Sequence, residues 1–112
     1  MKPLKILSHL LLSLFALNSY ANSSIEPNKL QGLVIHDDGH SVLIYGTNNF
    51  IHTEGCPLKF IVLDKSHPNY QAMYSTLLAA YHAQTSIRGW VNGCSSFGGA
   101  NLTRLDLGMI SY

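Results

Sequence analysis

Short apolar runs separated by turn-forming residues predict five strands along this chain. The expected strands span residues 30–36, 41–46, 57–64, 86–92 and 102–110. The first two flank Asp37-Asp38-Gly39. An Asp-Gly pair between apolar runs is typical of a tight hairpin, because glycine supplies the positive φ that the turn requires.

One segment has the periodicity of a helix instead. Between residues 69 and 84 the large apolar side chains recur at spacings of three and four, which places them on one helical face. They are Tyr70, Met73, Tyr74, Leu77, Leu78 and Tyr81. Ser66 is the expected N-cap and Pro68 is expected in the first turn, where a missing N–H costs nothing. We expect the apolar face to pack into the core.

The predicted order is therefore three strands, a helix and two strands (β-β-β-α-β-β). This order fits a mainly β OB-fold-like domain, a five-stranded and partly open Greek-key barrel. An open α+β sheet with one helix on its face has the same order and is the alternative. Residues 29–112 are expected to form this single domain. Residues 22–28 are polar and contain Pro27, so they are expected to be a flexible lead-in.

Residues 1–21 have the pattern of a secretory signal peptide. Lys2 and Lys5 form a positive start, an apolar stretch follows, and the segment ends in Ser19-Tyr20-Ala21. The apolar stretch is too short for a bilayer span of about 20 residues, although a retained anchor helix is the alternative. We therefore expect an exported protein, periplasmic or secreted, without a membrane span once the signal peptide is removed.

The two cysteines, Cys56 and Cys94, both lie after the predicted signal peptide. In an oxidising compartment they are expected to form one disulfide. A bridge closing a loop of this length is worth roughly 3–4 kcal/mol in the chain-entropy model. Free thiols or metal ligands are the alternatives, but neither cysteine belongs to a C-x-x-C motif.

The charge balance and the motif content narrow the function. After residues 1–21, five Lys and Arg residues stand against six Asp and Glu residues. Binding to nucleic acid or to an anionic membrane needs a basic excess, so neither is expected. The sequence has no Gly-x-Ser-x-Gly, His-Glu-x-x-His or phosphate-loop motif. We therefore predict a protein that is not an enzyme and uses no cofactor.

His36 and His40 flank the expected hairpin turn and are the candidate metal ligands. Two imidazoles and two carboxylates within five residues have the chemistry of a metal site. No standard ligand spacing is met, so we favour a solvated turn in which the aspartates serve the backbone. A periplasmic metal-binding protein is the second alternative function.

Arg88 and Trp90 are expected on one outward face of the strand over residues 86–92. A Trp beside an Arg is suited to stacking on a sugar ring or to anchoring a subunit interface. The alternative is that the loop over residues 93–100 covers Trp90. Tyr45 is a lesser candidate of the same kind. OB-folds present such side chains to oligonucleotides or oligosaccharides, and the charge balance with the expected export favours a saccharide.

Several motifs follow one another in a recognisable layout. They are Cys56, Phe60-Ile61-Val62-Leu63-Asp64, Leu77-Leu78-Ala79-Ala80, Ile87-Arg88-Gly89-Trp90, Gly93-Cys94 and Leu105-Asp106-Leu107. From about Leu30 to Tyr112 the chain resembles a group of small exported bacterial proteins. The layout is also similar to the B subunit of subtilase-type AB5 toxins.

The resemblance implies a non-enzymatic OB-fold subunit of a homopentamer that binds sialylated glycans. In the toxin subunit a serine at the start of the first strand contacts the sugar, and Gln31 takes that position here. A tyrosine on the fourth strand also contributes there, and Val91, next to Trp90, replaces it. These departures bear on sialic acid specificity and not on the fold. The alternative function is a monomeric envelope protein that binds other proteins.

Overall fold

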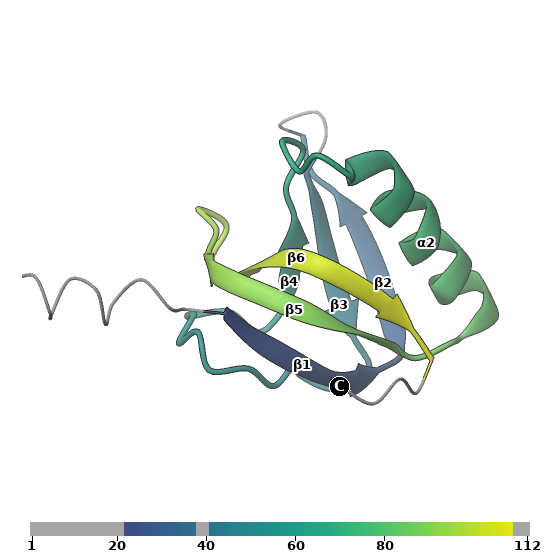
Figure 1. Cartoon of the computed structure of the whole chain (residues 1–112), viewed down its shortest axis with the longest axis horizontal. Coiled ribbons are helices and arrows are strands. Elements are labelled where there is room, and N and C mark those ends of the chain that lie inside the picture. Colours follow the sequence, from purple (N-terminus) through teal and green to yellow (C-terminus); the bar gives the residue numbers. More distant parts are fainter. Residues whose placement is uncertain (1–21, 38–40, 109–112) are drawn as a thin grey trace, which may run out of the picture.

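The computed structural model (Figure 1) describes residues 22–37 and 41–108. The predicted signal peptide, the tip of the predicted hairpin and residues 109–112 lie outside the described residues. The elements are β1 Asn22–Asn28, β2 Leu30–Ile35, β3 Val42–Gly46, β4 Ile61–Leu63, α2 Tyr70–Ala83, β5 Ile87–Cys94 and β6 Ala100–Leu107. Within the described residues, α2 is too short and too polar to cross a membrane.

Within the same residues, six strands form one sheet in the order β1-β5-β6-β4-β3-β2. β4 and β6 pair in parallel, whereas the other neighbouring strands are antiparallel. The two edge strands, β1 and β2, follow each other in the chain with only Lys29 between them. The sheet therefore curls until its edges meet, as Figure 1 shows. Counted as one bent strand, β1 and β2 complete an OB-fold-like five-stranded barrel with one helix, which confirms the predicted fold class.

Residues 22–28 are strand β1, so the prediction of a flexible lead-in was wrong. β1 pairs with β5, and its inward positions Ser23, Ile25 and Asn28 are buried. Two of these three buried side chains are polar, which hid the usual alternation of a strand. Pro27 lies where the register of the β1–β5 pair shifts, and proline is tolerated at such an irregularity because no ladder hydrogen bond is lost there.

The main core fills the inside of the curled sheet, and α2 covers one side of it. Its fully buried strand side chains include Ile25, Leu30, Val42, Ile44, Ile61, Leu63, Ile87 and Val91. The helix contributes Met73, Leu77 and Ala80. The buried helical face is narrower than the sequence predicts, because Leu78 and Tyr81 stay 44% and 42% exposed. A small barrel offers one helix only a strip of contact.

The ends of α2 differ from the predicted ones. Asn69, not Ser66, is the N-cap residue, and its side chain makes no capping hydrogen bond. Ser66 instead donates its backbone N–H and its hydroxyl to the Asp64 carboxylate. At the other end Gln84 adopts a left-handed conformation, with φ of 54°, and its amide donates to the Leu30 carbonyl at 3.3 Å. This contact ties the end of the helix to β2.

Truncating the buried side of α2 should cost far more stability than truncating its exposed side. Leu77 is completely buried and Leu78 is 44% exposed. We expect Leu77→Ala to lower the free energy of unfolding by about 2–5 kcal/mol, because it leaves a cavity. The matched Leu78→Ala should cost less than about 1 kcal/mol. Urea denaturation measures both, and equal losses would contradict the observed orientation of the helix.

Candidate functional site

The outer face of β3 and β4 carries a second apolar cluster. It consists of Leu43, Phe60 and Val62, with Phe97 from the β5–β6 loop packed against them. Successive side chains of a strand point to opposite faces, so Leu43 lies opposite the core residues of β3. Both faces of β3 and β4 are therefore apolar and covered.

At the edge of this cluster a half-exposed aromatic ring, Tyr45, packs on a buried one, Phe60. Tyr45, at the end of β3, is 38% exposed, whereas Phe60 is buried and only 9% exposed. Their ring centroids lie 5.1 Å apart at a tilted angle of 43°, a separation at which aromatic rings attract each other. One face of the barrel thus presents an aromatic surface to solvent.

A groove of about 440 Å³ opens beside this pair. It is lined by Gln31, Tyr45, Gly46, Thr47, Asn48, Asn49, Leu58, Lys59 and Phe60. Tyr45, Phe60 and Leu58 form its apolar part, while carboxamide side chains and one ammonium form its exposed polar part. A mostly apolar hollow with a few converging polar groups is the usual form of a small-molecule site.

The buried Asn28 side chain supports one wall of the groove from behind, through Thr47 and Asn48. Its amide nitrogen donates to the Asn48 carbonyl at 2.7 Å. Its amide oxygen accepts from the Thr47 hydroxyl at 3.2 Å and from the Asn48 N–H at 3.4 Å. Gly46 leaves room for this amide, because a Cβ there would lie 2.3 Å from the Asn28 nitrogen. A residue of β1 therefore shapes a site that lies against β3.

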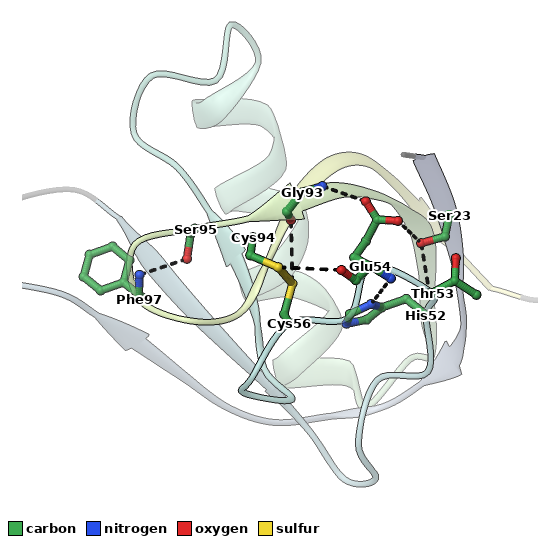
Figure 2. Close-up of a disulfide and its surroundings, with 9 residues drawn as sticks. All are labelled: Ser23, His52, Thr53, Glu54, Cys56, Gly93, Cys94, Ser95 and Phe97. Carbon is green, nitrogen blue, oxygen red and sulfur yellow. Dashed lines mark hydrogen bonds between the residues drawn. A yellow bond between two sulfur atoms is a disulfide. The ribbon is translucent and has the colours of Figure 1, made fainter. Parts of the chain in front are cut away.

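The predicted disulfide between Cys56 and Cys94 is present, with a Cα–Cα distance of 5.5 Å. It joins the long loop between β3 and β4 to the end of β5 (Figure 2). Glu54 reinforces this connection. Its carboxylate accepts the Gly93 N–H at 2.7 Å and the Ser23 hydroxyl at 2.9 Å. The loop that supplies most of the groove is thus fastened to both β1 and β5.

His52 lies in the same loop, in surroundings that favour its neutral form. Its Nδ1 accepts the Glu54 N–H at 3.2 Å, and its Nε2 is buried without a hydrogen-bond partner in the described residues. Burial lowers the pKa of His52; Glu54 opposes this shift and Lys59 adds to it. Because His52 bonds to the backbone of its own loop, the arrangement supports the loop.

The structure separates the four ligand-binding candidates into two places. Gln31 and Tyr45 both line the groove. Arg88 and Trp90 lie on β5 between fully buried residues and are half-buried themselves, which matches the predicted outward alternation. Arg88 stands opposite Asp106 on β6, as part of a surface next to β1 and β6 and away from the groove.

Sequence reasoning did not identify most of the groove. The carboxamides of Asn48 and Asn49 stood in a segment predicted only as a loop, and Lys59 and Phe60 in a segment predicted as a regular strand. The observed β4 begins only at Ile61. Two consecutive asparagines shortly after Tyr45, separated from it by Gly46 and Thr47, were the one available signal. Such residues combine hydrogen bonding with an aromatic surface.

Of the two candidate metal ligands, His36 belongs to the described residues. His36 Nδ1 lies 2.9 Å from the Asp37 carboxylate, and the His36 ring lies 4.4 Å from the ring of Phe97. His40 lies outside the described residues. In the part of the chain that the structure describes, no three His, Cys, Asp or Glu side chains are grouped as a metal site.

Comparison with known proteins identifies no relative. The chain matches no protein-family model, no curated protein sequence and no solved structure. The geometry of the groove and the pattern of the sequence are therefore the basis for a functional proposal.

Removing the Asn28 amide should loosen the groove wall. We expect Asn28→Ala to lower the free energy of unfolding by about 1–3 kcal/mol, since three hydrogen bonds to residues 47 and 48 are lost. The control is Asn48→Ala, because Asn48 is exposed and binds Asn28 through its backbone. Chemical denaturation compares the two variants. An equal, small effect would show that the buried amide does not support this turn.

The lowered pKa of His52 predicts a dependence of stability on pH. His52 takes up a proton less readily in the folded protein than in the unfolded chain, where its pKa has the ordinary value of 6.5. The contribution of neutral His52 to the free energy of unfolding is therefore complete above pH 6.5, and it declines as the pH falls below 6.5. His52→Asn keeps an acceptor near the Nδ1 position and should flatten this part of the profile. Urea midpoints between pH 5 and pH 8 test this, and identical profiles for both proteins would contradict it.

Proposed function

We propose that this protein is an exported, non-enzymatic domain that binds a saccharide in the groove beside Tyr45. The observation that carries the proposal is the half-exposed Tyr45, which packs on the buried Phe60 and shares the groove with the carboxamides of Gln31, Asn48 and Asn49. A pyranose ring has an apolar C–H face and a rim of hydroxyl groups. The aromatic pair complements the face, and carboxamides both donate to and accept from the hydroxyl groups.

The position of the groove on the fold supports this proposal. OB-folds bind oligosaccharides and oligonucleotides on the face of their second and third strands. With β1 and β2 counted as one strand, these are β3 and β4, which present Tyr45 and the apolar cluster. Among the described residues that line the groove, Lys59 is the one charged side chain. A nucleic-acid site would need several cations to neutralise phosphates, so the saccharide is favoured.

Export rests on two features of different kinds. Residues 1–21 have the charge and hydropathy pattern of a signal peptide. The Cys56–Cys94 disulfide belongs to the type of bond that persists in oxidising compartments. We accordingly place the protein in the periplasm or outside the cell.

A protein-binding envelope domain is the second candidate function. Val34 and Ile35, at the end of β2, are 45% and 59% exposed, and exposed apolar side chains are typical of protein contacts when they gather in one place.

The resemblance to toxin B subunits adds the prediction of a pentamer. Light scattering on the oxidised protein distinguishes a pentamer from a monomer. A monomer would favour the protein-binding envelope domain over the pentameric, toxin-like subunit.

Loss of Tyr45 should strongly weaken saccharide binding without unfolding the domain. On a glycan array we expect the oxidised protein to bind a subset of glycans, and Tyr45→Ala to bind them at least roughly tenfold more weakly, as for loss of an aromatic stacking contact. Tyr81→Ala is the matched control, because Tyr81 on α2 is 42% exposed, close to the 38% of Tyr45.

The control variant should keep the affinity of the unchanged protein. The proposal fails if the folded, oxidised protein binds no glycan, or if Tyr45→Ala and Tyr81→Ala bind equally well. Thermal unfolding of each variant shows that a loss of binding comes from the groove and not from the fold.

A further inference from the structure

A second hollow, of about 300 Å³, lies next to the groove. It is lined by Asn49, Phe50, Ile51, His52, Gly55, Cys56 and Lys59. Asn49 and Lys59 line both spaces. The groove and the second hollow are therefore neighbours, separated by two exposed polar side chains.

The second hollow is open and has an apolar contact surface. Ile51 is 66% exposed, the largest exposed fraction among the large apolar side chains of the described residues. Gly55 has a positive φ of 71°, and a Cβ there would meet no atom within 4 Å. An aliphatic side chain that is mostly exposed to solvent contributes little to folding and is suited to contact with a ligand.

The loop that lines the groove and the second hollow is fixed by contacts within the protein itself. The Asn28 amide fastens its beginning, and the Glu54 carboxylate and the disulfide fasten its later part to β1 and β5, as Figure 2 shows for the latter two. Little chain entropy is then lost when a ligand binds, which favours affinity. A ligand long enough to reach the second hollow would gain contacts there without reorganising the loop.

We propose that the protein recognises a saccharide chain of at least two sugar units, and that the second hollow is the site of the second unit. This inference rests on the proposed function and concerns the same site. One ring packs on Tyr45, the linkage passes Asn49 and Lys59, and the next ring packs on Ile51. The two polar side chains suit the hydroxyl groups and the bridging oxygen between two rings, because both donate hydrogen bonds.

The length of the saccharide is the variable to test. The probe is an array that carries glucose, galactose and N-acetylglucosamine as chains of one, two and four units. For the sugar that binds, we expect about tenfold higher affinity for two units than for one, and little further gain for four. Ile51→Ser should remove this gain and leave the affinity for one unit unchanged. Tyr45→Ala should weaken binding at every length.

Ile35→Ser is the matched control for Ile51→Ser. Ile35 on β2 is an isoleucine that is 59% exposed, and it does not line either hollow. The gain from one unit to two should survive in this variant. Equal affinity for one and two units, or a gain that persists in Ile51→Ser, overturns the inference and leaves the Tyr45 groove standing. Absence of any binding that depends on Tyr45 overturns both proposals.

Discussion

The structure depends on the one-residue link between the two edge strands of its sheet. β1 and β2 lie at opposite ends of the strand order, yet only Lys29 separates them in the chain. Neighbouring Cα atoms are only about 3.8 Å apart, so the edges must meet and the sheet must curl. The curl encloses the core and places Asn28, at the bend, against the turn that follows β3.

Side chains, rather than a backbone ladder, hold the long loop between β3 and β4. Phe50 is 97% buried, Glu54 bonds to two strands and Cys56 is covalently joined to β5. The contacts of Glu54 and Cys56 each bridge segments more than 30 residues apart in the chain. A loop fixed in this way can display polar side chains in a set geometry, which is the condition for selective binding.

The two covered faces of β3 and β4 link the fold to the proposed function. The inner face supplies Ile44 and Ile61 to the core, while the outer face supplies Leu43 and Val62 to the second cluster. This second cluster supports Phe60 and, through it, Tyr45. The aromatic surface is thus backed by packed side chains, and its orientation follows from the same strands that close the barrel.

The sequence by itself determined the mainly β class, the helix over residues 70–83, the disulfide and the exposure of Tyr45, because these follow from local periodicity and from cysteine number. Only the tertiary structure decided that residues 22–28 form a strand, since the buried positions Ser23 and Asn28 are polar and their partners lie in a distant loop. Only the tertiary structure decided that Gln31 and Tyr45 line the same groove, and that Trp90 on β5 does not line it. Which side chains share a groove depends on strand order and register, and long-range pairing of this kind leaves no periodic trace in a sequence.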